Sequence, residues 1–227
     1  MHNRDHIFFS TMAVLMAAVV AIGFGRTYGP RIAGGTATPL IHLHAAVFAT
    51  WMVLYIVQSV LVARGRTAVH RRLGVWGAFF ATALIAIGAV TGVVAARHGF
   101  RGNPPGPLTP LQFLLAAPVR DMLVFGGLTG AAIAQSRDVQ AHKRLMLMAT
   151  LGGLVPAGAS RLPGGNPVFL PVFLALLLAG PVYDWLTRRT IHRAYVWGLS
   201  VTVLSTAVFT GLSYTNAWQS FAQTLID

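Results

Sequence analysis

The sequence contains no cysteine and no glutamate, and only 10% of its 227 residues are charged. Without cysteine the chain cannot form disulfide bonds, thiolate metal sites, iron–sulfur clusters or a cysteine nucleophile. A soluble domain normally contains about 25% charged residues, so this chain has too little polar surface to face water on all sides. Hydrophobic residues make up 55% of the chain, and its mean hydropathy is +0.65. The composition therefore predicts an integral membrane protein.

The apolar residues form runs that are long enough to cross a bilayer. A helix needs about 20 apolar residues to span a hydrocarbon core of roughly 30 Å. Such runs lie at residues 7–25, 40–63, 73–96, 110–135, 142–160, 167–187 and 193–214. They predict an all-α, polytopic membrane protein, in which seven transmembrane helices form a bundle and residues 1–227 form a single domain.

The basic residues indicate the orientation of these helices. The formal net charge of +12 would suggest nucleic-acid binding in a soluble protein. Here the basic residues lie between apolar runs, where they act as topology signals and contact anionic lipid, so the lipid bilayer is the expected partner and nucleic acid is not. With a cytoplasmic N-terminus, the cytoplasmic segments hold eleven of them (Arg4, Arg64, Arg66, Arg71, Arg72, Arg137, Lys143, Arg144, Arg188, Arg189, Arg193) and the opposite segments five (Arg26, Arg31, Arg97, Arg101, Arg161). This bias predicts a multi-pass inner-membrane protein with its N-terminus in the cytoplasm.

Three predicted helices begin with a similar box of residues on the cytoplasmic side. The boxes are Val69-His70-Arg71-Arg72, Ala141-His142-Lys143-Arg144 and Ile191-His192-Arg193. Two His residues at one membrane level on different helices have the arrangement of axial ligands to a b-type haem, which makes His70 and His142 candidate iron ligands. Candidates for the haem propionates are Arg71, Arg72, Lys143 and Arg144. The alternative is that these boxes anchor the helices to lipid headgroups.

Arg120 and Asp121 are adjacent ionisable residues deep inside a predicted span. They lie about ten residues into it, or about 15 Å deep at 1.5 Å per residue. Ionisable groups at that depth are rare and are functional candidates by default. Adjacent side chains on a helix point about 100° apart, so these two need not pair with each other. Asp121 could form a hydrogen bond with His44, Gln58 or Tyr55, or exchange a proton. The alternative is a paired or neutral Asp121 that fixes helix packing.

The second predicted span carries a polar stripe. His44, Trp51, Tyr55 and Gln58 are separated by offsets of 7, 11 and 14 from the first of them, which places them on one helix face. An unsatisfied polar group in hydrocarbon is costly, so this face should meet other helices or water. His44, Trp51 and Gln58 are therefore candidates for the wall of a cofactor or solute cavity. Interhelical hydrogen bonding is the structural alternative.

Several of these residues together resemble a known family. His44, Trp51 and Gln58 followed by His70-Arg71-Arg72-Leu73-Gly74, and then by His142-Lys143-Arg144-Leu145-Met146, resemble an uncharacterised family of bacterial predicted membrane proteins with HRRLG and HKRLM boxes. The resemblance covers about residues 40–163 and implies a polytopic bacterial membrane protein without an assigned activity. A looser resemblance is to the di-haem cytochrome b ferric reductases that use ascorbate and to other four-helix haem b bundles. Residues 110–135 depart from that pattern because they contain no His, so this resemblance implies one haem at most.

Three hypotheses of function follow. The first is a membrane redox component that binds one haem b or a quinone, with His70 and His142 as ligands and Asp121 near a proton path. The second is a transporter or channel for a proton or small solute, lined by the polar stripe and by Arg120 and Asp121. The third is a non-catalytic subunit that associates with other membrane subunits or with copies of itself.

Overall fold

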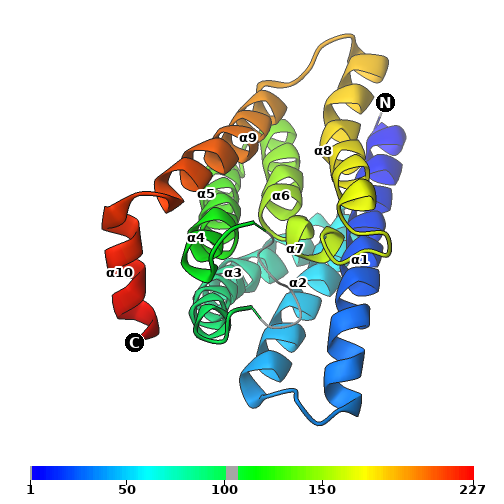
Figure 1. The fold of residues 1–227 in the computed structure, drawn as a ribbon. Helices are drawn as coiled ribbons and strands as arrows, with labels where there is room; N and C mark the ends of the chain where they lie inside the picture. Colours follow the sequence, from blue (N-terminus) through cyan, green and yellow to red (C-terminus); the bar gives the residue numbers. More distant parts are fainter. Residues whose placement is uncertain (1, 101–106) are drawn as a thin grey trace. The chain divides into compact units, whose positions relative to one another are not determined.

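The computed structural model describes residues 2–100 and 107–227, and within those ranges the chain contains helices and no strand (Figure 1). Arg101, which the sequence assigns to the outer side, lies outside the described residues. The elements are α1 (His2–Ala33), α2 (Pro39–Ala63), α3 (Thr67–Arg97), α4 (Pro110–Leu114), the π-helical segment η1 (Leu115–Val119), α5 (Arg120–Ala134), α6 (Val139–Gly153), α7 (Val155–Ala159), α8 (Asn166–Arg188), α9 (Arg193–Ser213) and α10 (Asn216–Ile226).

Six helical segments of the described chain are long and apolar enough to cross a membrane. They are Arg4–Ala33, Pro39–Ala63, Thr67–Arg97, Pro110–Ala134, Asn166–Arg188 and Arg193–Ser213. Apolar side chains on their surfaces include Trp76, Phe79 and Trp197, which are 66–72% exposed and suit a lipid environment. The chain is thus an all-helical, multi-pass membrane protein.

The predicted span at 142–160 is not one of these six segments, because the helix is interrupted at Leu154. Pro156 has no backbone N–H, and its ring would clash with the carbonyl group of Gly152 in a continuous α-helix. Two consecutive glycines, Gly152 and Gly153, end α6 just before this point. The apolar run is therefore divided into α6 and the short α7.

The described chain separates into two compact units. The first contains Met1–Leu84 and Val155–Gly180, and the second contains Ile85–Leu154 and Pro181–Asp227. In the first unit α1 packs against α2 and α7. The contact between α1 and α7 brings Gly23 and Gly158 together so closely that a Cβ atom on Gly23 would overlap the Gly158 carbonyl group. Small residues allow this close approach of two helices in lipid.

The second unit is built around α5 and α6, which lie side by side and antiparallel, with α9 packed against α6, α5 and η1 (Figure 1). Its helices also approach closely at glycines: a Cβ atom on Gly198 of α9 would lie 2.5 Å from Met148 Cγ of α6. The amphipathic α10 packs on α4, where the indole N–H of Trp218 donates to the Leu111 carbonyl oxygen at 2.7 Å.

Candidate functional site in the second unit

Arg120 and Asp121 begin α5, at the middle of the candidate span Pro110–Ala134. Both residues are buried, with 8% and 5% of their surface exposed. The Arg120 side chain folds back along the helix, so that Nε donates to Asp121 Oδ1 at 3.0 Å and the Nη2 group contacts the same oxygen. The two adjacent residues therefore form an ion pair with each other, the arrangement that the sequence left as the structural alternative.

A π-helical turn directly precedes this pair. Pro118 lies inside η1, and a proline within a helix removes one backbone hydrogen bond and displaces the preceding turn. Gly92 of α3 accommodates the widened turn, because a Cβ atom there would lie 2.9 Å from Pro118 Cβ. Single π-helical turns inside α-helices occur frequently at functional sites. The position of η1 beside a buried ion pair makes this part of the span a candidate functional site.

Neighbouring helices complete the surroundings of the pair. Thr206 of α9 accepts a hydrogen bond from Arg120 Nη1 at 2.6 Å and donates its own proton to the Thr202 carbonyl oxygen at 2.9 Å. From the other side α6 approaches closely, because a Cβ atom on Gly153 would lie 2.7 Å from the Asp121 carbonyl oxygen. The guanidinium group is thus shared between a carboxylate and a hydroxyl inside the unit.

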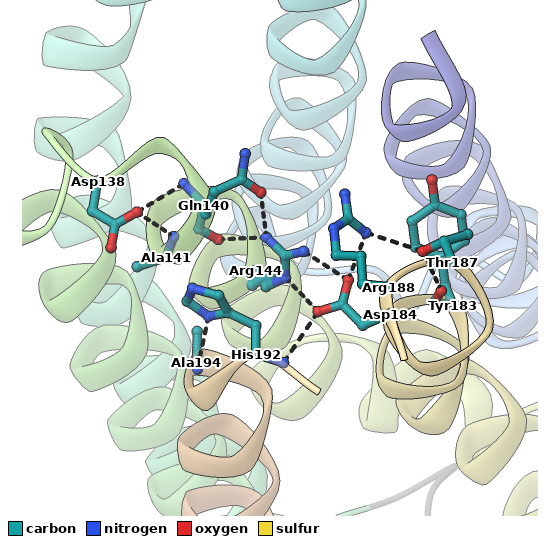
Figure 2. Close-up of polar contacts among 10 residues, drawn as sticks. All are labelled: Asp138, Gln140, Ala141, Arg144, Tyr183, Asp184, Thr187, Arg188, His192 and Ala194. Carbon is teal, nitrogen blue, oxygen red and sulfur yellow. Dashed lines mark hydrogen bonds and ion pairs between the residues drawn. The ribbon is translucent and has the colours of Figure 1, made fainter. Parts of the chain in front are cut away.

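A second buried ion pair joins α6 to α8 (Figure 2). Arg144 Nε donates to Asp184 Oδ2 at 2.8 Å, and Arg144 Nη2 donates to Asp184 Oδ1 at 2.6 Å. Arg188 Nη1 also donates to Oδ1 at 2.9 Å, and the His192 backbone N–H donates to Oδ2 at 3.2 Å. Arg144 Nη1 donates to the backbone and side-chain oxygens of Gln140 at 2.9 and 2.7 Å. The Asp184 carboxylate therefore accepts four hydrogen bonds.

The two pairs differ in geometry. Arg144 uses two nitrogens on two oxygens of Asp184, which is the strong fork-to-fork arrangement of a guanidinium and a carboxylate. Arg120 directs two nitrogens to a single oxygen of Asp121. The Arg120–Asp121 pair therefore lacks the fork-to-fork geometry of the Arg144–Asp184 pair. The four hydrogen bonds that Asp184 accepts connect α6, α8 and the start of α9, so Asp184 acts as a structural clamp.

Two helix caps lie next to the clamp, outside the candidate spans. Asp138 caps α6, and the hydrogen bonds that it accepts from the backbone N–H groups of Ala141 and Gln140 lower the pKa of its carboxyl group. His192 caps α9, where its Nδ1 accepts from the Ala194 backbone N–H at 3.2 Å. Partial burial is the main cause that lowers the pKa of His192. The nearby charges that oppose or add to this are Arg144, Arg193, Asp138 and Asp184.

The remaining predicted site residues are distributed over both units. In the second, His142 Nδ1 contacts the Ala132 carbonyl oxygen at 2.8 Å, and Lys143 follows it on α6 half-buried. In the first, Gln58 Nε2 donates to the His70 carbonyl oxygen at 3.2 Å, which ties α2 to α3. The other predicted residues of the first unit are Arg71 and Arg72, both exposed, the half-buried His44 and the buried Trp51. Binding of haem or quinone by these residues stays a prediction.

Asp184 is the site residue that sequence reasoning missed. It lies near the end of the predicted span 167–187, and the sequence analysis did not select it as a candidate. It is fully buried, with 0% of its surface exposed. Two features of the sequence pointed to it: it is an acid within an apolar run, and Arg188 follows it four residues later on the same helix face.

The chain was compared with family models, curated proteins and solved structures. No family model matches the chain, and no curated protein or solved structure matches it either. The resemblance to the uncharacterised bacterial family therefore stays a prediction.

Proposed function

We propose that the protein is a proton-coupled transporter or proton channel in which Asp121 binds the proton within the membrane. The observation that carries this proposal is the buried Arg120–Asp121 pair at the middle of a candidate span, beside a π-helical turn. Ionisable groups inside the membrane that pair with one another are characteristic of proton relays and solute pathways.

The chemistry requires that Asp121 has two alternative ways to be neutralised. In the described state, the guanidinium group of Arg120 neutralises the carboxylate. When a proton enters from one aqueous phase and binds the carboxylate, the carboxyl group becomes neutral and Arg120 is released from it. Arg120 retains its hydrogen bond to Thr206, which limits the cost of that release. Departure of the proton to the other phase restores the pair.

The proposal includes seven membrane crossings with a cytoplasmic N-terminus, in the inner membrane of a bacterium. Contacts at the ends of two spans support the seventh crossing. Asp138 follows the end of α5, Arg193 follows the end of α8, and their side chains approach to 3.9 Å. Because α5 and α8 both end at this level and each crosses the membrane, the chain between them must return across it once. The segment available for that return is α6 with α7. The basic residues at this level favour the cytoplasmic side.

The experiment is a proton-flux measurement on the full-length protein in liposomes. A pH difference or a membrane potential is imposed, and an enclosed pH-sensitive dye reports the internal pH. We expect the wild-type protein to dissipate the gradient faster than empty liposomes, and Asp121→Asn to remove most of that difference. Asn is close in shape to Asp but cannot take up a proton, and Arg120 keeps its hydrogen bond to Thr206. Because the buried Arg120 loses its counter-charge, flux is compared at a temperature at which unfolding measurements show both proteins to be folded. Flux that is unchanged in Asp121→Asn would overturn the proposal.

The matched control is Asp138→Asn. Asp138 is a carboxylate of the same unit, but it caps α6 at the surface, and Asn is an equally good cap. This variant should transport protons at the wild-type rate. Equal loss of flux in both variants would show that the assay reports folding or reconstitution, and would also contradict the role of Asp121.

A second candidate function, a redox component that binds haem b or a quinone, is favoured by His142. Its Nδ1 lies 2.8 Å from the Ala132 carbonyl oxygen, so Nδ1 carries a proton and donates it to that oxygen. Histidines that bind metal usually donate their other ring N–H in this way, so His142 fits an iron ligand. A b-type haem supplies one-electron transfer when bound. Arg144 fits a propionate partner less well, since Asp184 and Gln140 occupy its donors.

An absorption spectrum tests this second function. The purified protein is measured oxidised and reduced, and its lipid extract is analysed for quinone. A Soret band that is lost in His142→Ala supports haem ligation, and a quinone that co-purifies supports a quinone site. If neither is found, the redox function is rejected and the proton-transport proposal is unaffected.

A further inference from the structure

One end of the first unit gathers basic and aromatic side chains from three segments. They come from the last turns of α1, the first turns of α2 and the residues that follow α7. Arg26 Nη1 donates to the Arg161 carbonyl oxygen at 3.4 Å, which brings these two arginines together. The guanidinium carbon of Arg161 lies 4.6 Å from the centre of the Phe24 ring. The hydroxyl of Tyr28 and Nδ1 of His42 are 2.6 Å apart and connect α1 to α2.

The charge at this end has no compensating carboxylate within the described residues of the unit. The one acid of the first unit is Asp5, and 21 residues of helix α1, or about 30 Å, separate it from Arg26. Exposed charges are screened over about 8 Å at physiological ionic strength, so Asp5 does not neutralise this end. Arg26, Arg31 and Arg161 therefore produce a positive field that attracts anions.

His44 supplies an independent observation. Its ring stacks on Phe48 with 4.1 Å between ring centres and lies 6.5 Å from the centre of the Phe24 ring, which also carries Arg161. Nδ1 of His44 is buried, and no described residue forms a hydrogen bond with it. His44 is five residues into α2, about 8 Å from its start. A buried polar atom without a partner is costly, and a ligand that forms a hydrogen bond with it would remove that cost.

We infer that this end of the first unit is a binding site for an oxyanion of the phosphate type. Arg26 and Arg161 would donate to two of its oxygens, since a guanidinium group matches the geometry of phosphate. His44 Nδ1–H would donate to an oxygen that reaches below the surface. The Phe24 ring holds the Arg161 guanidinium group by a cation–π contact and limits its freedom before the ligand arrives. The inference concerns a different unit from the proposed proton pair and does not depend on it.

The same chemistry has two sources, the headgroup of an anionic lipid and a free phosphate ion, and ligand-dependent stability distinguishes them. Thermal unfolding of the full-length protein in non-ionic detergent is measured with inorganic phosphate against chloride at equal ionic strength. It is then measured with added phosphatidylglycerol against phosphatidylcholine. A rise in Tm with phosphate indicates a soluble anion, because a ligand that binds only the folded state stabilises it. A rise with phosphatidylglycerol alone indicates a lipid headgroup. No rise with either overturns the inference.

Three variants localise the effect. Arg161→Gln should abolish the ligand-dependent rise in Tm, whereas Arg97→Gln should retain it in full. Arg97 is a matched control, because its guanidinium group donates to the Leu225 carbonyl oxygen at 2.9 Å, as that of Arg161 donates to the Ala157 carbonyl oxygen. If Arg161→Gln does not fold, His44→Phe serves instead, since it keeps an aromatic ring on Phe48 and removes the donor. A rise in Tm that persists in Arg161→Gln contradicts the site, as does one that persists in His44→Phe when Arg161→Gln does not fold. Loss of the rise in Arg97→Gln also contradicts it.

Discussion

Arg144 and Asp184 are 40 residues apart in the sequence, yet they form a buried ion pair with two parallel hydrogen bonds of 2.8 and 2.6 Å. Arg188 and the backbone N–H of His192 add further bonds to the same carboxylate. This arrangement fastens the end of α8 and the start of α9 to α6 (Figure 2). The second unit contains one more buried pair, Arg120 and Asp121, whose two partners are neighbours in the sequence.

The clamp predicts a large loss of stability in Asp184→Asn. The substitution removes a buried carboxylate and leaves the Arg144 guanidinium group, 1% exposed, without its counter-charge. Breaking a buried pair in this way costs about 3–5 kcal/mol. Thermal unfolding in detergent should show a clear decrease in Tm, while Asp138→Asn should change it little. Equal Tm values for the two variants would show that the pair is not a clamp.

The packing of α6 on α5 predicts that Gly153→Ala destabilises the protein. The new Cβ atom would lie 2.5 Å from Phe125 Cβ and 2.7 Å from the Asp121 carbonyl oxygen. Overpacking of this kind costs about 1–3 kcal/mol. Gly127→Ala on α5 is the control, because a Cβ atom there has no neighbour within 4 Å. Alanine favours a helix over glycine by about 1 kcal/mol, so the control should be neutral or stabilised. A Tm that falls equally in both variants contradicts this packing.

The Arg120 contact predicts a smaller effect in Thr206→Val. Valine is similar in shape to threonine, but it cannot accept the 2.6 Å hydrogen bond from Arg120 Nη1. A buried donor without an acceptor costs about 1–3 kcal/mol. The variant should have a lower Tm and slower proton flux than Ser205→Ala, whose hydroxyl donates only to the Thr202 carbonyl oxygen among the described contacts. Wild-type flux and stability in Thr206→Val would place Thr206 outside the site.

The cap of α9 predicts a pH-dependent stability. His192 accepts a hydrogen bond through Nδ1, and its pKa is lowered from 6.5 mainly by partial burial and then by Arg144. The neutral form is therefore favoured in the folded protein. Its contribution to stability is complete above pH 6.5 and is lost as the pH falls through 6.5 towards the lower pKa of the folded state.

His192→Asn tests that dependence. Asparagine caps a helix well and does not titrate in this range. The decrease in Tm between about pH 7 and pH 5 should therefore be smaller in the variant than in the wild type. An identical decrease in both proteins would assign the pH dependence to other groups.

The sequence predicted the helical membrane fold and the burial of Arg120 and Asp121, because both follow from apolar runs that are long enough to span a membrane. It did not predict that the two would pair. The argument from the 100° angle between neighbouring positions holds for Cβ directions, but the long Arg side chain bends back to reach its neighbour. The depth of a group is readable from the sequence, whereas the direction of a flexible side chain is not.

The interruption of the predicted span at 142–160 could have been predicted from the sequence. Gly152, Gly153 and Pro156 lie within five residues, and that combination disfavours a continuous α-helix. The mean hydropathy of the run does not reveal this interruption, because all three residues are compatible with an apolar segment. The partner of Asp184 could not be found in this way, since the pair with Arg144 depends on how α6 and α8 pack.

Infrared difference spectroscopy tests the central claim, that Asp121 takes up a proton. A protonated carboxyl group in apolar surroundings has a high-frequency carbonyl band that exposed acids do not share. On acidification of the protein in liposomes, the band should appear in the wild type and in Asp138→Asn, and it should be missing in Asp121→Asn. A band that persists in Asp121→Asn, or one that never appears in the wild type, would contradict the account.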